Sequence, residues 1–142
     1  MPVRMELSRI LIRELVDYQI IELREVSDSE DLDGAGRTFP IVIGLPEAQA
    51  IERRLKGIQI KRPQTHDLLM NILSALGAKL ESIVINDLSD HTFYALLNVR
   101  TKDGEKVQID SRPSDAIALG IANNIAVYVE EHVLDAAQSE DI

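Results

Sequence analysis

Hydrophobic and polar residues alternate along several short stretches of the chain, and a spacing of two is typical of strands with one buried face. The alternation predicts seven strands: 5–12, 19–26, 39–43, 80–85, 92–100, 106–110 and 125–129. The first three and the next three each form a triplet that starts with a hairpin. In the second hairpin, Leu88-Ser89-Asp90-His91 supplies residues that favour a turn.

A different spacing, of three and four residues, predicts the helices. Between the triplets, Leu68, Leu69, Ile72 and Leu73 share one face, and Gly77 is a natural helix stop. Pro46 and Pro113 follow the third strands, and proline is favoured at the first position of a helix. The expected helices are 46–55, 65–76, 113–122 and a last turn near 133–137.

The two triplets resemble each other in sequence. Residues 7–26 align with 80–99 at a constant shift of 73 positions, and seven of the 20 pairs are identical. Chance at this composition would give roughly one or two identities. We therefore predict one α+β domain over 1–142, with copy one at about 3–60, a linking helix at 65–76 and copy two at about 79–130. The strands are expected to form a mixed, largely antiparallel sheet or half-barrel flanked by helices.

Composition and net charge limit which functions and which cellular locations we expect for the chain. The formal net charge is −9 and the pI about 4.7, which is the wrong sign for a protein that holds nucleic acid by neutralising many phosphates. The chain also has few aromatic residues on which unpaired bases could stack. Contact with DNA or RNA would therefore be local and brief. With no cysteine, no targeting segment and no long apolar run, we expect a soluble cytoplasmic protein that does not enter membranes.

Candidate chemistry gathers at two predicted helix starts, each with Arg-Pro followed by Asp: 62–69 (RPQTHDLL) and 110–117 (DSRPSDAI). Helix N-termini attract anions, and arginine presents a planar fork suited to phosphate. Asp110 and Asp115 could bind a hard cation, and His66 beside Asp67 could move a proton.

A structural interpretation explains many of the same residues. Thr65 and Ser114 are good N-caps, and negative charge at Asp67 and Asp115 stabilises a first helical turn. Capping alone does not need these aspartates when Thr and Ser already supply the cap. Both interpretations therefore stay open from the residues alone.

Three other features are interpreted as structural or solvated. The acidic loop 28–34 matches a calcium-binding loop poorly. His91 and His132 lack partners at metal-ligand spacing. The basic residues between 53 and 62 are expected to form a solvated helix face, with a phosphate-tracking edge as the alternative.

At these motifs the chain resembles the bifunctional nuclease domain family. The resemblance is carried by residues 62–77, 83–94 and 109–120, and residues 41–55 also fit. It implies degradation of DNA and RNA, as in at least some members. The positions to which it assigns a functional role are His66, Asp67, Asp110, Arg112, Ser114 and Asp115.

These groups suggest a metal-assisted hydrolysis of phosphodiesters. Asp110 and Asp115 would hold Mg²⁺ or Mn²⁺, Arg112 would steady the developing charge, and His66, oriented by Asp67, would act as general base. Ser114 is a weak nucleophile candidate for which capping is the alternative role.

Two function classes follow from the sequence. One is a nuclease with DNA or RNA as a transient substrate; the other is a non-catalytic regulatory or protein-interaction module, which the acidic surface and the scarcity of aromatics favour. A homo-oligomer is expected in either case, with a dimer as the simplest form, because two strand triplets leave sheet edges to be covered.

Overall fold

The structure is a computed structural model and describes residues 2–13, 15, 18–26, 36–58, 61–121 and 123–139. Its described elements are β1 (Pro2–Leu11), β2 (Gln19–Glu25), β3 (Thr38–Ile43), α1 (Leu45–Leu55), α2 (Thr65–Ala75), β4 (Lys79–Ser89), β5 (Thr92–Arg100), β6 (Lys106–Ser111), α3 (Pro113–Ile121), β7 (Ala126–Glu130) and α4 (Glu131–Ser139). The predicted α+β class is confirmed.

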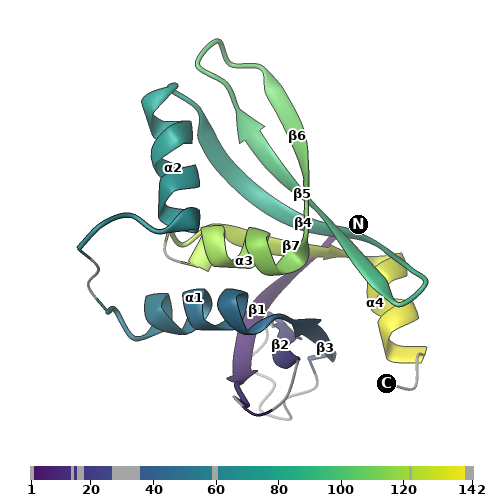
Figure 1. Cartoon of the computed structure of the whole chain (residues 1–142). Coiled ribbons are helices and arrows are strands. Elements are labelled where there is room, and N and C mark those ends of the chain that lie inside the picture. The colour runs from purple at the N-terminus through teal and green to yellow at the C-terminus, as the bar shows by residue number, and fades with distance from the viewer. Residues whose placement is uncertain are drawn as a thin grey trace.

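The described strands form one open mixed sheet in the order β3-β2-β1-β7-β4-β5-β6 (Figure 1). Each triplet is an antiparallel meander, as the alternating pattern predicts. β7 lies between the triplets, antiparallel to β1 and parallel to β4. The last strand of the sequence therefore joins the two copies, and β3 and β6 are the edges.

The first strands of the two copies match in structure as they do in sequence. β1 has an irregularity between Leu7 and Arg9, and β4 has one at the equivalent place, between Leu80 and Ser82. Such bulges bend a strand and re-aim its side chains. Both copies thus keep the same local bend at the same position of the repeat.

The second strands do not follow the same alignment. Ile10 pairs with Ile21, whereas its counterpart Ile83 pairs with Leu97 and not with Tyr94, the counterpart of Ile21. Ile21 is buried and Tyr94 is exposed, because a change of register by an odd number of residues moves a side chain to the other face. The gapless match of 7–26 with 80–99 is therefore wrong for the second strands.

The turn of the second hairpin is shorter than predicted. β4 continues through Leu88 to Ser89, and only Asp90 and His91 connect it to β5. Both residues have positive φ, at 51° and 62°, which is the conformation of a two-residue turn whose twist matches the strands. An irregularity between Ile85 and Asp87 lets the strand extend beyond the predicted end.

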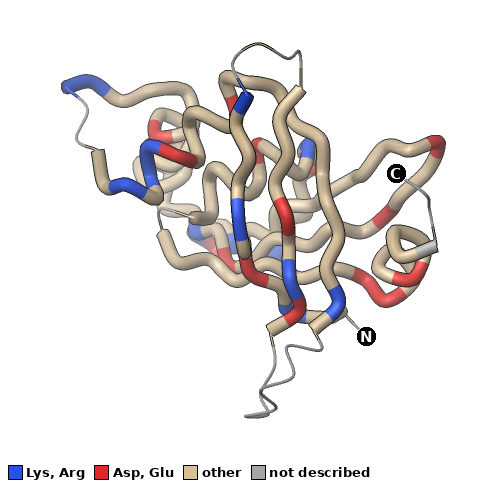
Figure 2. Tube along the Cα trace, turned by 90° about the horizontal axis from the view of Figure 1, so that it is seen from below, with Lys and Arg blue, Asp and Glu red and all other residues tan. Residues whose placement is uncertain are grey.

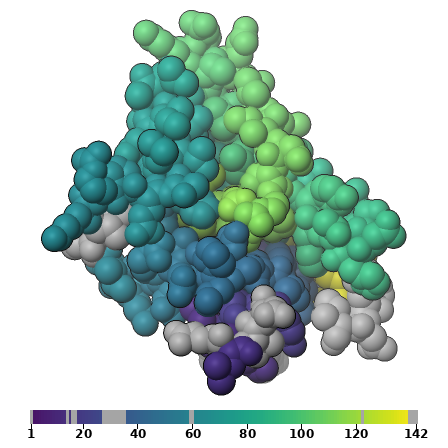
Figure 3. Space-filling view, in the orientation of Figure 1, coloured from purple at the N-terminus to yellow at the C-terminus, as the bar shows by residue number. Residues whose placement is uncertain are grey.

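Helices α1, α2 and α3 lie together beside the sheet (Figures 1 and 3). α3 packs against α1, α2 and strands β4 and β5, and α4 packs against β3, β4 and β7. Phe39 of β3 and Phe93 of β5 meet with ring centroids 5.4 Å apart, so the two copies share one core. No helix in the described ranges is long and apolar enough to span a bilayer.

The surface charges of copy one are largely matched across its strands. Arg24 lies 2.9 Å from Glu6, and Arg9 lies 3.2 Å from Glu22. Figure 2 shows basic and acidic segments interleaved along neighbouring strands. Cross-strand pairs of opposite charge favour the observed register and leave this surface without one dominant sign.

Candidate functional site

The starts of α2 and α3 converge at a contact between His66 and Asp115. His66 Nε2 lies 3.0 Å from Asp115 Oδ1, and His66 is only 9% exposed. An ionised carboxylate only accepts hydrogen bonds, so Nε2 carries the hydrogen in this contact. The helix between the copies is thereby joined to the helix of copy two.

Arg112 extends this contact to the first copy. Its Nε donates to Asp115 Oδ2 at 2.8 Å, and its terminal nitrogen donates to Glu47 Oε1 of α1 at 2.9 Å. The residues Glu47, Arg112, Asp115 and His66 therefore form one continuous set of contacts, which we call the four-residue network. It brings α1, α2 and α3 together on one side of the molecule.

The network fixes the charge of its carboxylate. Burial raises the pKa of Asp115, but the hydrogen bonds from Arg112 and His66 outweigh burial and hold that pKa below its ordinary range. The same contacts, with Asp115 first and Glu47 second, raise the pKa of the Arg112 guanidinium. Asp115 therefore stays ionised at neutral pH and can orient the His66 ring.

Asp67 takes a different role from the predicted one. Its Oδ1 accepts from Arg54 at 2.6 Å, and its Oδ2 accepts from the backbone N–H of Gln64 at 3.1 Å. It thus belongs to a capping box at the start of α2, with Gln64 at the N-cap. In the described part of the chain the Asp67 carboxylate makes no hydrogen bond with the His66 ring, and the carboxylate that contacts the ring is Asp115.

Two predictions about caps and solvation are wrong in detail. Thr65 is the first residue of α2 and Ser114 lies in the first turn of α3, so neither is the N-cap. Arg54 is not solvated, because its side chain is only 10% exposed and pairs with Asp67. Ser114 is buried, at 6% exposed.

Asp110 does not join the network. Ile109, beside it on β6, shares a sheet face with Ile83, which meets α3 at Gly120. Because side chains alternate along a strand, Asp110 points to the opposite face from α3 and Asp115. The Mg²⁺ or Mn²⁺ pair expected from Asp110 and Asp115 is therefore not assembled by this arrangement.

The donors present also fit a metal poorly. Both oxygens of Asp115 and one oxygen of Glu47 already accept hydrogen bonds from His66 or Arg112. Among the described residues no group of three or more His, Asp and Glu side chains is arranged to hold an ion. The acidic loop 28–34 lies outside the described residues.

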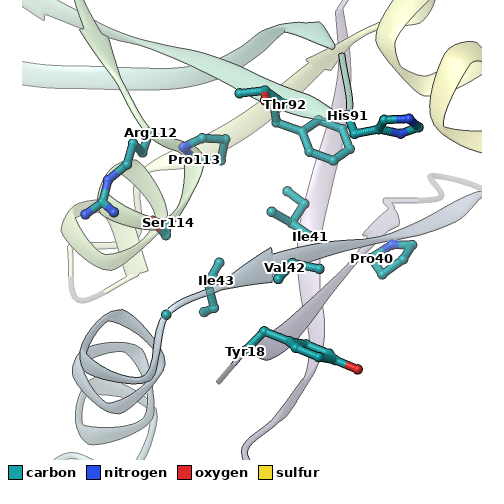
Figure 4. A pocket seen from close by; sticks show the side chains of 12 residues that line it. Tyr18, Pro40, Ile41, Val42, Ile43, His91, Thr92, Arg112, Pro113 and Ser114 are labelled. Carbon is teal, nitrogen blue, oxygen red and sulfur yellow. The ribbon is translucent and has the colours of Figure 1, made fainter. Parts of the chain in front are cut away.

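A cavity of about 550 Å³ opens beside Arg112, between the two copies (Figure 4). Its lining comes from Tyr18, from Pro40 to Gly44 at the end of β3, from the β4–β5 turn and from the start of α3. Ile41, Val42 and Ile43 form an apolar wall, and Arg112 lies at one end. Its size lies within the range of small-ligand sites.

Sequence reasoning missed Glu47, and it missed Asp67 as the partner of Arg54. Glu47 lies 65 positions before its partner Arg112, and Arg54 lies 13 positions before Asp67. Neither separation is a motif spacing. The one available indication was that α1 and α3 are equivalent helices of the repeat. Equivalent helices can pack side by side, which would bring an acid at the start of one near a base at the start of the other.

Comparison with known proteins gives consistent similarities. Residues 30–141 match the family model of the bifunctional nuclease domain. An uncharacterized protein of Mycobacterium tuberculosis is 40% identical over 101 residues, which cover 71% of this chain and 59% of the relative. Bifunctional nuclease 2 and bifunctional nuclease 1 of Arabidopsis thaliana are 23% and 24% identical over 104 residues, covering 71% of this chain and 31% and 32% of those proteins. The match thus spans less than two thirds of each relative.

Proposed function

This chain belongs to the bifunctional nuclease domain family, and we propose that it is a nuclease that hydrolyses phosphodiester bonds in DNA, RNA or both. The residue-level observation that supports the proposal is the His66–Asp115–Arg112 arrangement. It combines a histidine oriented by an ionised carboxylate with a guanidinium, and these are groups that phosphodiester hydrolysis uses.

The roles follow from which atoms are engaged. With Nε2–H directed at Asp115, the other ring nitrogen of His66 can accept a proton from the attacking water. Asp115 stabilises the imidazolium that forms. The ring is largely buried, so substrate binding has to open a path for one water molecule to reach it.

Arg112 would hold the phosphate. Its side chain is 65% exposed although it donates to two carboxylates, and guanidinium carries five N–H donors. The remaining donors can bind a phosphoryl oxygen and stabilise its developing charge. A base or sugar of the same strand would rest on the apolar wall of the adjacent cavity.

Assistance by Mg²⁺ or Mn²⁺ stays a prediction. Both oxygens of Asp115 already accept hydrogen bonds, so an ion could bind this carboxylate only if the contact from His66 or Arg112 were given up. Asp110 points away from that position. The proposed roles of His66, Arg112 and Asp115 do not depend on the ion.

The test is cleavage of single-stranded and double-stranded DNA and RNA by highly purified protein, with and without EDTA. His66→Gln should lower the rate about 10²-fold or more, the usual contribution of a general base. His132→Gln is the matched control, because His132 lies on α4 with an exposed side chain. Equal cleavage by wild type and His66→Gln would refute the role of His66 and point to a contaminating nuclease.

A non-catalytic interaction module is the second candidate, favoured by one observation. The oxygens of Asp115 are committed to internal hydrogen bonds, so the network can simply hold three helices together. In that case no preparation would cleave any substrate with any divalent metal, and His66→Gln would lower only stability.

A further inference from the structure

The cavity beside Arg112 lies along the free edge of β3, and the register of that strand fixes which backbone groups face it. In an antiparallel pair, every second residue directs its N–H and C=O at the neighbouring strand, and the others direct theirs away. The N–H of Glu25 donates to the Arg37 carbonyl at 2.9 Å, just before β3 begins. Residues 37, 39, 41 and 43 therefore form the set that faces β2.

The other set, which includes Pro40 and Val42, faces away from the sheet. Two observations agree with this assignment: proline has no N–H to give to β2, and the Thr38 carbonyl of the same set accepts from Gln138 of α4. Among the described strands, β3 has no neighbour on that side. Val42 lines the cavity, so its N–H donor and its C=O acceptor are open to a ligand there.

A buried hydroxyl borders the same cavity from α3. Ser114 lines the cavity and is only 6% exposed, and its side chain makes no hydrogen bond within the described residues. Buried polar groups normally have a partner, so this hydroxyl is available to a ligand oxygen. Ser114 lies in the first turn of a helix of nine residues, where backbone N–H groups have no partner within the helix. The guanidinium of Arg112 lies at the same end of the cavity.

We propose that the cavity takes one unpaired nucleotide of a DNA or RNA strand, with its phosphate at Arg112 and Ser114 and its base against Val42. The inference rests on the proposed nuclease function and names its substrate class, which is single-stranded nucleic acid. Every base carries a hydrogen-bond donor next to an acceptor on its Watson–Crick edge, and enzymes that take a base out of the stack read this edge. In a duplex those groups are already paired, so only an unpaired base can present them to the Val42 backbone.

The remaining lining suits the flat faces of a base. Ile41 and Ile43 supply apolar surface, and Tyr18, which is 46% exposed, supplies an aromatic ring (Figure 4). Stacking on an aromatic ring tolerates any base, because every base has a π-face. One backbone donor and one acceptor likewise match a pair of groups that all bases have. The cavity therefore selects unpaired against paired nucleotides, and does not select one base against another.

The charge of the chain agrees with a site for one nucleotide. A protein that follows a duplex neutralises many phosphates, and a formal net charge of −9 disfavours that mode of binding. A single phosphate needs only the donors at one end of the cavity. The rest of the contact is apolar or comes from uncharged backbone groups, which do not depend on a basic surface.

Amide NMR of the isotope-labelled protein in EDTA tests the site without requiring cleavage. Uridine monophosphate should shift the backbone amide resonances of Val42 and Ser114, whereas inorganic phosphate should shift that of Ser114 only. Val107, on the other edge strand of the sheet, should respond to neither. A Val42 resonance that uridine monophosphate does not move would overturn the placement of the base, and an unmoved Ser114 resonance would overturn that of the phosphate.

Fluorescence anisotropy in EDTA, with a labelled single strand and a hairpin of the same base composition, measures the selectivity. Wild type should bind the single strand about tenfold more tightly. Val42→Pro removes the outward N–H, which an edge strand tolerates, and should weaken single-strand binding about threefold to tenfold. Val42→Ala keeps the N–H and should lose less. Val107→Ala, at an exposed apolar position outside the cavity, should bind as wild type does.

Thermal melting establishes that Val42→Pro is folded, and the amide titration of wild type does not depend on that variant. Equal affinity for the strand and the hairpin would overturn the substrate class. So would a folded Val42→Pro that binds the single strand as tightly as Val42→Ala. Selective binding without cleavage by any preparation would support the nucleotide site and refute the nuclease. Equal cleavage of strand and hairpin, with an unmoved Val42 resonance, would refute the site and leave the nuclease in place.

Discussion

His66 Nε2 and Asp115 Oδ1 lie 3.0 Å apart although their residues are 49 positions apart in the chain. The contact joins the start of α2, the linking helix, to the start of α3, the helix of copy two. It therefore contributes to the fold whether or not the histidine takes part in hydrolysis. Stability and cleavage have to be measured on the same variants.

Asp115→Asn should change the pH dependence of stability. The pKa of Asp115 is lower in the folded than in the unfolded chain, so the folded chain binds fewer protons there. Its stabilisation is complete above the unfolded value of about 3.9 and is lost as pH falls through the folded value. In urea unfolding between about pH 7 and pH 3, wild type should lose more free energy of unfolding than Asp115→Asn.

Comparison of Asp115→Asn with wild type also controls for the other acids that titrate in this pH range. Glu81 and Glu131 also have lowered pKa values, through hydrogen bonds from Arg100 and Arg37 respectively, and both remain in Asp115→Asn. Their effect cancels in the difference between the two curves. Parallel curves would contradict the assigned charge state of Asp115.

Arg54→Ala should destabilise the fold by about 1–3 kcal/mol, because it leaves the partly buried Asp67 carboxylate with the Gln64 backbone N–H but without its charged donor. The Arg54 side chain is 10% exposed and that of Asp67 is 31% exposed. Lys56→Ala, on the same helix, removes an exposed pair with Glu52 and should cost less than about 0.5 kcal/mol. Chemical denaturation of both variants measures the difference, and equal losses would show that burial does not matter here.

Gly120→Ala tests the packing of α3 on the sheet. A Cβ at this position would lie 2.7 Å from Ile83 Cδ1. Crowding should cost about 1–3 kcal/mol, more than the helix preference of Ala restores. Ile83→Val removes the clashing methyl group, so the double variant should lose less stability than the sum of the two single losses. A strictly additive result would mean that Ile83 moves aside freely.

Much of the fold was readable from local patterns. Alternation located all seven described strands, and Pro113 and Gly77 marked helix ends within a residue or two. The predicted register of β5 was wrong. A gapless alignment of the two copies does not show how many residues the turn and the bulges take up in each copy. The same uncertainty in the number of loop residues is why the turn was predicted as four residues, 88–91, and not as the two residues Asp90 and His91.

The candidate site was predicted only in part. The sequence placed His66 and Asp115 at helix starts, but assigned Asp67 to a role that Asp115 occupies. An acid in the first turn of a helix can either accept a backbone N–H of that helix or contact a side chain of another helix. Which of the two it does depends on how the helices pack, and the sequence does not show this. Glu47 was missed for the same reason.

The central position of β7 has a consequence for how the protein is made. Val3, near the start of β1, pairs with Val129 of β7. While a ribosome is still extending the chain, β1 and β4 each lack a neighbour, and the nascent molecule carries two additional open edges that finished molecules do not have. The sheet is complete only after β7 has emerged, so premature termination upstream of β7 should yield products prone to aggregation and proteolysis.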